Sequence, residues 1–265
     1  MYHKITSVFV ISIALFASIG CAAKEDFAVV AYNVENLFDL DAISMFSDYR
    51  QETRDPALAY SRAKLLTKLS SVSEVLATVN SGAGPEVILF QELEADFTPA
   101  TKAVDYAAFL QAYADTTVAA MLGEGWRSVY ADFSAAEWLV KALSDAGMSG
   151  YSVVTVPSRG EDSGIAHTNA VFSQFPILAS VAHPLVQARD ILQVTLDIDG
   201  ASLTVYDNHW KSGASNPKRE PIRVENARVL RGLIDAENRA NPQADFLIGG
   251  DLNSHYNHSA LNPDL

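Results

Sequence analysis

The sequence contains continuous apolar runs, which predict buried strands, and one-sided apolar spacings, which predict helices. Residues 27–32 (FAVVAY) and 86–90 (EVILF) are runs of the first kind. Between them, residues 55–56 (DP) are typical of a helix start, with Asp as the N-cap, and residues 80–82 (NSG) are typical of a helix end. One face of this helix is expected to consist of five apolar residues at spacings of four and three: Leu65, Leu69, Val72, Leu76 and Val79.

The later part of the chain is predicted to be richer in strands. Alanine-rich residues 101–122 and 134–146 predict helices, and residues 220–239 predict a longer one. Asp199-Gly200 is a hairpin signal. Strands are expected at 151–156, 169–173, 191–198, 203–207 and 245–248. Strands interspersed with helices, with no repeat and no long linker, predict one layered α/β (α+β) domain after the N-terminal segment.

The N-terminal segment, residues 1–23, is predicted to be an export signal. Lys4 precedes an apolar run over residues 5–19 that ends in small residues and is short for a membrane span. A buried core helix is the alternative. Cys21 resembles the lipidated cysteine of a bacterial lipoprotein, and cleavage after Ala23 competes with lipidation. The expected location is therefore outside the cytoplasm: the periplasm, the outer membrane as a lipoprotein, or the medium.

Composition narrows the functional classes. The chain has 265 residues, with 19 Lys and Arg against 32 Asp and Glu, for a formal net charge of -13. This acidity argues against a protein that coats nucleic acid by electrostatics alone. It leaves open an enzyme that meets phosphate through a metal ion, which inverts the local charge. A single cysteine excludes an intramolecular disulfide framework and a cysteine-based zinc cluster.

Four polar segments follow predicted apolar strands, where layered folds collect functional groups. Their carboxylates and amides suit Mg²⁺ or Mn²⁺, and a histidine nearby could transfer a proton near neutral pH. Asp251 and Asn253, two apart on extended backbone, are expected to point to the same side. The four segments are 32–36 (YNVEN), 90–94 (FQELE), 207–212 (DNHWKS) and 249–254 (GGDLNS).

Together, YNVENLFD, the Gln91-Glu92 pair, NHWKS and GDLN resemble the endonuclease/exonuclease/phosphatase superfamily of DNase I-like proteins, and NAVFSQFPI at 169–177 is similar to its central strand and turn. The resemblance covers about residues 27–257. It implies a two-sheet β-sandwich flanked by helices, with the site at one end of the sandwich.

The resemblance also implies roles for single residues. Asn33 and Glu92 match the metal-site positions, with Glu92 the principal ligand, and Glu35 matches a supporting acidic position. The implied cofactor is Mg²⁺ or Mn²⁺, with Ca²⁺ as a third candidate.

Three further positions match catalytic residues of the superfamily. His209 matches the histidine that acts on the leaving group, and Asp251 the carboxylate that orients or activates the attacking water. Asn253 matches the amide that holds the phosphate and that carboxylate. Asn208 and Lys211 are weaker candidates, and Arg159 and Arg189 are not selected, because most arginines are surface residues.

The sequence departs from the superfamily at its C-terminal end. Members continue to a strand that carries an Asp-His pair, and His255 and His258 follow Asn253 too closely to supply it. The domain over residues 24–265 is therefore expected to be incomplete and the chain to be a fragment of a longer protein, with a natural truncation that impairs the chemistry as the alternative. The predicted strand 245–248 is then expected to lie at an unpaired sheet edge.

The leading functional hypothesis is a metal-dependent phosphodiesterase, a DNase-like endonuclease that acts on DNA as a monomer, with a lipid anchor if Cys21 is modified. A phosphatase or a sphingomyelinase-like phospholipid phosphodiesterase is the alternative enzyme. Exposed aromatic loops would favour a lipid substrate, and Trp126, Phe133 and Trp138 are the candidates for them. A truncated, non-catalytic surface module is the alternative from another class.

Overall fold

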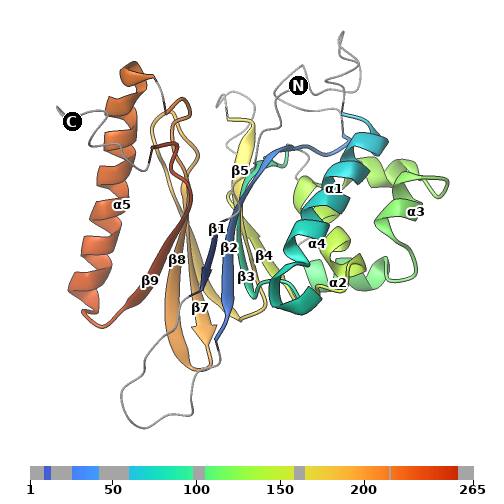
Figure 1. The fold of residues 1–265 in the computed structure, drawn as a ribbon, viewed down its shortest axis with the longest axis horizontal. Coiled ribbons are helices and arrows are strands. Elements are labelled where there is room, and N and C mark those ends of the chain that lie inside the picture. The colour runs from blue at the N-terminus through green and yellow to red at the C-terminus, as the bar shows by residue number, and fades with distance from the viewer. Residues whose placement is uncertain are drawn as a thin grey trace.

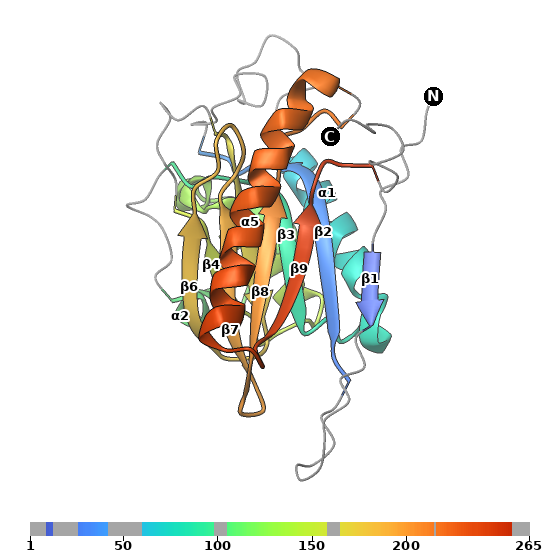
Figure 2. The ribbon, with the colours of Figure 1, turned by 90° about the vertical axis from the view of Figure 1, so that its left-hand side faces the viewer.

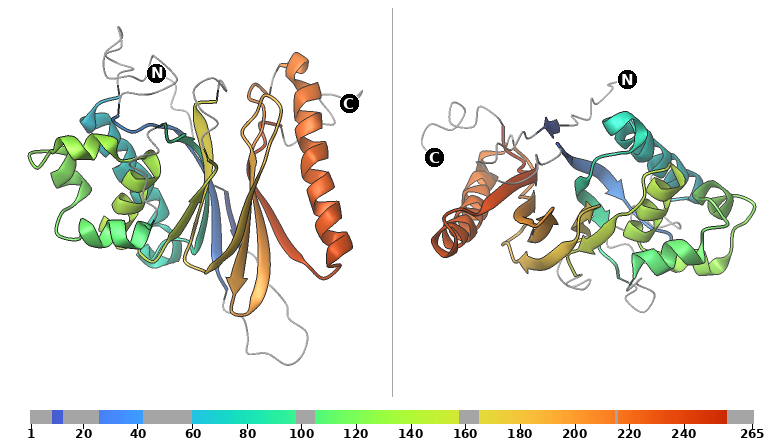
Figure 3. Two further views of the ribbon diagram at one scale, coloured as in Figure 1. Left: turned by 180° about the vertical axis from the view of Figure 1, so that it is seen from behind. Right: turned by 90° about the horizontal axis from the view of Figure 1, so that it is seen from below.

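Two β-sheets packed face to face form the centre of the protein, and helices cover the outer face of each (Figure 1). The computed structural model describes residues 9–12, 26–41, 60–97, 105–157, 165–214 and 216–255. The predicted helix-flanked sandwich is confirmed. The layers run from α1–α4 through the first sheet and the second sheet to α5, as the view from behind and the view from below also show (Figure 3).

The first sheet, which we call sheet A, has the strand order β1-β2-β3-β5-β4. β2 and β3 are parallel, whereas β5 runs antiparallel to both β3 and β4, and β1 is antiparallel to β2. The strand bounds are Phe9–Ser12 for β1, Ala28–Leu37 for β2, Val87–Glu94 for β3, Ser152–Thr155 for β4 and His167–Ser173 for β5.

The second sheet, sheet B, has the order β6-β7-β8-β9. β8 and β9 are parallel, and the predicted hairpin at Asp199-Gly200, with both residues at positive φ, joins β7 to β8. Figure 2 shows α5 lying across the outer face of this sheet. The bounds are Ile177–His183 for β6, Ile191–Ile198 for β7, Ala201–His209 for β8 and Asp245–Asp251 for β9.

The helices bury apolar faces against the two sheets. Leu65, Leu69, Val72 and Leu76 are buried as predicted, and they pack in the core between sheet A and its helices. The α-helices are α1 (Arg62–Leu76), α2 (Tyr106–Ala112), α3 (Val118–Leu122), α4 (Ala135–Asp145) and α5 (Glu220–Ala240). Three 3₁₀ helices are η2 (Val79–Gly82), η3 (Ser128–Asp132) and η5 (Pro217–Arg219).

Several predicted element bounds are wrong, for local reasons. The first helix begins at Arg62, because the side chain of Ser61 accepts a hydrogen bond from the backbone of Lys64; residues 55–56 lie outside the described residues. Val79 belongs to η2, whose residues Asn80 and Ser81 have left-handed backbone and end the helix as predicted. The helix predicted over residues 101–122 is two helices, since Asp105 and Thr117 each cap a separate one.

Other differences concern strands. β6 was not predicted, because its residues are mostly exposed and its sequence, ILASVAH, shows no strict alternation. β2, β3, β8 and β9 all run farther than predicted, into the polar segments that follow the apolar runs. β9 has only β8 as a partner in the described part of the chain, which agrees with the expected sheet edge.

The N-terminal predictions lie largely outside the described residues. β1 falls within the predicted export signal, and Cys21 and Ala23 lie in a range that is not described. Among the described residues, no helix combines the length and the apolar character that crossing a membrane requires.

Gly250 allows β9 to approach β8 where the two polar segments meet. Its φ is 111°, and a Cβ added there would lie 2.1 Å from the backbone oxygen of Asn208. Because that contact is with backbone, no side-chain rotation can relieve it. Gly250 therefore sets the position of Asp251, the next residue.

We expect Gly250→Ala to lower the free energy of unfolding by roughly 2 kcal/mol or more, because left-handed backbone and a backbone clash add. Urea unfolding measures this. Gly232→Ala in α5 is the matched control, since a Cβ there meets nothing within 4 Å, and it should stabilise the helix by up to about 1 kcal/mol. Equal stability of the two variants would contradict the proposed close approach.

Candidate active site

The four polar segments meet at one end of the sandwich, the upper end in Figure 1. Asn33 in β2 is paired in register with Gln91 in parallel β3, and His209 in β8 is paired with Asp251 in parallel β9. Parallel strands end at the same sheet edge, so each sheet brings two polar segments together. The face-to-face packing of the sheets then joins the two pairs.

Asn33 links two carboxylates that come from different sheets. Its Nδ2 donates to Oε1 of Glu92 and to Oδ2 of Asp251, each at 3.0 Å. The backbone N–H of Asn36 donates to Oε2 of Glu92 at 3.1 Å, and the backbone N–H of Asn253 donates to Oδ1 of Asp251 at 2.8 Å. Both carboxylates are therefore fixed at both oxygens.

His209 is almost fully buried beside this pair. Its side chain is 1% exposed, and its Nε2 lies 3.6 Å from Oε1 of Glu92 and 3.9 Å from Oδ2 of Asp251. Burial, followed by the charge of Arg189 and the neighbouring His167, holds the pKa of His209 well below its usual value. His209 is therefore a neutral ring in the free protein, able to donate one hydrogen bond.

Glu35 and Asn253 lie beside the four central residues and contact them through their backbones. The backbone N–H of Glu35 donates to Oδ1 of Asn33 at 2.9 Å, but the Glu35 carboxylate makes no hydrogen bond or ion pair with the described residues. The extended backbone expected from Asp251 to Asn253 is wrong, because β9 ends at Asp251 and Asn253 has a φ of 49°. The Asn253 side chain instead donates to the backbone oxygen of Trp210 at 3.2 Å.

Left-handed backbone is concentrated at this end of the sandwich. Glu35, Asn36, Glu92 and Asn253 all have positive φ, although none is glycine. The β2–β3 and β3–β5 pairings shift register at these residues, so Glu92 sits in a bulge. Lys68 in α1 stabilises the backbone at the end of β2, since its Nζ donates to the backbone oxygens of Val34 and Glu35. Strained backbone of this kind is frequent at functional sites.

The carboxylates present fit a hard divalent cation. The described residues include no group of three or more His, Cys, Asp or Glu side chains placed to hold a metal ion. Mg²⁺ is commonly bound by only one or two carboxylates, with water and substrate phosphate completing its ligands. Glu92 and Asp251 supply two such carboxylates, and the only described side chains that contact both are those of Asn33 and the neutral His209.

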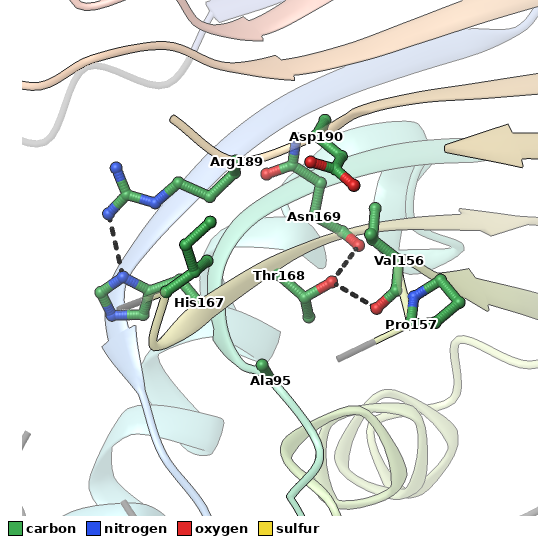
Figure 4. A pocket seen from close by; sticks show the side chains of 9 residues that line it. Ala95, Val156, Pro157, His167, Thr168, Asn169, Arg189 and Asp190 are labelled. Atoms are coloured by element: carbon green, nitrogen blue, oxygen red, sulfur yellow. Dashed lines mark hydrogen bonds between the residues drawn. The ribbon is translucent and has the colours of Figure 1, made fainter. Parts of the chain in front are cut away.

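Arg189 is a site residue that sequence reasoning did not select. It lies in the connection between β6 and β7, and its Nη2 is 3.0 Å from Nδ1 of buried His167; Figure 4 shows the two side chains. Burial lowers the pKa of Arg189, whereas the charges of Glu92 and Asp251 raise it. The guanidinium thus lies within electrostatic reach of both carboxylates. No local motif marks Arg189, because the strand pairing that brings it here is long-range.

A small cavity lies behind Arg189. Its volume is about 20 Å³, enough for one water molecule, and its lining includes His167, Asn169, Arg189 and Asp190 (Figure 4). Burial and the nearby Arg189 lower the pKa of His167 to about 3. His167 therefore stays neutral, so that its Nδ1 accepts the hydrogen bond from Arg189 and orients that cation.

The weaker candidates have structural roles. Asn208 is fully buried, and its side chain bonds the backbone oxygens of Tyr206 and Gly249 and the indole of Trp210. The backbone of Lys211 bonds the side chains of Asn226 and Arg223 in α5. Arg159 and His258 lie outside the described residues, whereas His255 is exposed.

Replacing His167 with Gln should change how stability depends on pH. Between pH 6.5 and about 3 the unfolded chain binds a proton at His167 that the folded chain does not, so stability falls as pH decreases. Gln removes this contribution and keeps an acceptor for Arg189. From pH 7 to pH 5 the wild type should lose about 2 kcal/mol more stability than the variant.

Urea unfolding at the two pH values measures this difference. His183→Gln is the matched control, because His183 lies on β6 and bonds Gln193 at 2.7 Å, away from Arg189. The same pH slope in the wild type and in the His167 variant would refute a neutral His167.

Comparison with known proteins agrees with this geometry. Residues 139–265 match the model of the Endonuclease/Exonuclease/phosphatase family. No curated protein sequence matches the chain. Among solved structures, beta toxin 275-280 from Staphylococcus aureus is 15% identical, with 90% of this chain and 70% of that chain covered and a TM-score of 0.52. The β-hairpin deletion mutant of beta toxin is 14% identical, with 89% of this chain and 69% of that chain covered and a TM-score of 0.50.

TDP2 from C. elegans is also similar, at 14% identity, with 86% of this chain covered and a TM-score of 0.48. The chain spans about half of that protein's length, 48%. At their identities the two beta-toxin structures show a shared fold. The family model matches residues 139–265, and both this match and the shared fold agree with the resemblance to DNase I-like endonuclease/exonuclease/phosphatase proteins.

Proposed function

We propose that the protein is a metal-dependent phosphodiesterase that cleaves DNA outside the cytoplasm. The superfamily contains hydrolases of phosphodiester bonds, and its enzymes generally use divalent metal ions. The observation that carries the proposal is the convergence of Asn33, Glu92, His209 and Asp251 from two sheets at one end of the sandwich. These are the residue types that phosphodiester hydrolysis requires.

Glu92 would hold the metal ion as its principal ligand, with Asn33 beside it, and Glu35 is near enough in sequence to support the site. When bound, the ion supplies charge stabilisation at a phosphoryl oxygen. Asn33 presents its Nδ2 to Glu92 in the free protein, so ligation through Oδ1 requires rotation of this amide. The structure thus supports Glu92 more directly than Asn33.

Asp251 would orient the attacking water. Its two oxygens accept hydrogen bonds from Asn33 and from the backbone of Asn253, which leaves the carboxylate fixed in one orientation. A fixed carboxylate serves as a general base without reorganising during the reaction. The side chain of Asn253 would then lie at the phosphate beside it.

His209 and Arg189 would stabilise the phosphate. Since burial and Arg189 lower the pKa of His209, its role is to donate a hydrogen bond from a neutral ring rather than to carry a positive charge. Arg189 supplies the fixed positive charge instead. A guanidinium held by His167 can bind phosphate oxygens without first becoming ordered.

The described residues favour a nucleic acid over a phospholipid. Trp138 and Phe133 are buried in the core, and Trp126 is half-buried with the Arg62 guanidinium 5.0 Å above its ring, so these aromatics do not form a lipid-binding loop. A groove of about 280 Å³ extends from Asn33 and Glu35 along Lys68. A polymer with several phosphates would occupy such a groove.

Hydrolysis assays with purified protein test this proposal. The full chain should nick supercoiled plasmid DNA with Mg²⁺ or Mn²⁺ and not with EDTA, and it should be less active on sphingomyelin vesicles. Asp251→Asn should lower kcat by about 10²- to 10⁴-fold, because it removes a general base. Its fold should remain, since Asn keeps the shape of the side chain.

Asp245→Asn is the matched control, because Asp245 is exposed at the far end of the same strand. Absence of metal-dependent hydrolysis with plasmid DNA, sphingomyelin and small phosphomonoesters would refute an enzymatic function and favour a non-catalytic surface module. Hydrolysis of sphingomyelin alone would favour the phospholipid alternative.

Export can be tested by mass spectrometry of the protein from bacterial cells. We expect removal of the segment before Cys21 or of residues 1–23. A mass increase by a diacylglycerol at Cys21 would establish a lipoprotein, and an N-terminus at Lys24 would establish ordinary secretion. A full-length chain in the cytoplasm would refute the proposed location.

A further inference from the structure

Three buried polar side chains connect the two sheets directly beneath the candidate active site. They are Gln91 in β3, Asn169 in β5 and Asp207 in β8, and they are 1%, 0% and 0% exposed. The surrounding interface between the sheets is otherwise a cluster of aliphatic side chains. Polar groups in such an interior are retained only with well-placed partners.

Gln91 and Asp207 form the first connection. Gln91 Nε2 donates to Oδ1 of Asp207 at 2.6 Å and to the backbone oxygen of Leu89 at 2.9 Å. Gln91 immediately precedes Glu92. Because Glu92 lies in the bulge of β3, Gln91 points between the sheets while Glu92 serves the site.

Asn169 forms the second connection. Its Nδ2 donates to the backbone oxygen of Asp207 at 3.2 Å and to that of Asp190 at 3.1 Å. Asp190 immediately follows Arg189. One side chain of sheet A thus holds two segments of sheet B, the start of β7 and the end of β8.

Each of these bonds ends within two residues of a site side chain. Gln91 is next to Glu92, Asp190 is next to Arg189, and Asp207 lies on the same face of β8 as His209, two residues on. Aliphatic contacts between sheets are non-directional and permit small relative shifts. Hydrogen bonds between the sheets are directional and fix their relative position.

We propose that Gln91, Asn169 and Asp207 form a clamp that sets the positions of Glu92, Arg189 and His209 relative to one another across the sandwich. They are positioning residues, because none of them reaches the site itself. This inference rests on the proposed hydrolytic function for its kinetic consequences. The placement of His209 that the clamp predicts can be measured without an activity assay.

The clamp holds Asp207 as a neutral acid. Oδ2 of Asp207 and Oδ1 of Asn169 are buried and have no hydrogen-bond partner among the described residues. A carboxylate would be a fully buried negative charge, with only the Gln91 side chain and the backbone N–H of Asn208 to stabilise it. Burial raises the pKa of Asp207 well above its usual value, which agrees with a bound proton. An asparagine at this position would therefore reproduce the clamp.

Two substitutions of Asp207 test the clamp. Asp207→Ala removes the acceptor of Gln91, and kcat should fall about 10- to 100-fold, with KM changed less than about threefold, because the site groups lose alignment. Asp207→Asn should restore most of kcat. Gln91→Met removes the same bond from the other side, and its effect should not add to that of Asp207→Ala in the double variant.

Nuclear magnetic resonance of ¹⁵N-histidine-labelled protein supplies a readout that does not depend on activity. The His209 ring signals, assigned with His209→Gln, should shift in Asp207→Ala and Gln91→Met and remain near the wild-type position in Asp207→Asn. Tyr151→Phe is the control, because Tyr151 belongs to the core between sheet A and its helices, and the substitution removes its buried 2.6 Å hydrogen bond to the backbone oxygen of Pro85. It should lower the melting temperature without moving these signals.

The outcomes separate the clamp from the proposed function. If the wild type hydrolyses no phosphoester but the His209 signals shift as expected, the function fails and the clamp stands. If Asp207→Ala and Gln91→Met lower only the melting temperature, as Tyr151→Phe does, the clamp is refuted. If Asp207→Asn is as impaired as Asp207→Ala, the neutral acid is refuted, because the position then needs its charge.

Discussion

The amide of Asn33 holds two carboxylates from different sheets, Glu92 and Asp251, and the rest of the site depends on this contact. Two carboxylates that share one hydrogen-bond donor group repel each other, so Glu92 and Asp251 stay together only because other interactions support them. Parallel pairing places each acid at a strand end, the bulge in β3 turns Glu92 toward the site, and Gly250 lets β9 approach β8. Cations then balance the charge.

The balance of charge is local and differs from that of the whole chain. The protein carries a formal charge of -13, yet two cations, Arg189 and Lys68, lie within electrostatic reach of Glu92 at the site. Both are partly withdrawn from water, which strengthens their fields. If the proposed function holds, the net negative charge of the chain would limit unspecific attachment to nucleic acid, and the local cations would bind phosphate at the site.

The sequence predicted which residues would meet at the candidate site, because their positions follow from strand periodicity and from a specific resemblance. Asn33, Glu92, His209 and Asp251 all follow apolar runs, and the structure brings all four together. It could not predict Arg189, because no local pattern distinguishes it from a surface arginine. Its place results from pairings between β5, β7 and β8 that no short segment encodes.

The elements of the fold were likewise predicted where local sequence determines them and missed where distant contacts do. α5 and β7 were predicted within one or two residues, since amphipathic and apolar periods extend over their whole length. The start of α1 was wrong because a capping hydrogen bond at Ser61 decides it, and β6 was missed because its stability comes from pairing with β7 rather than from its own residues. Gln91 illustrates the limit most clearly, because its bond to Asp207 crosses between the sheets and joins residues 116 positions apart.

The left-handed residues at the site have a consequence for the evolution of this protein. Four non-glycine residues with positive φ cost on the order of 1 kcal/mol each, a large part of the 5–15 kcal/mol by which a typical domain is stable. Glycine would relieve that strain at every one of them. Selection for thermal stability alone would therefore favour glycine at these positions. A lineage under that selection would become more stable and would lose the side chains that meet at the candidate site.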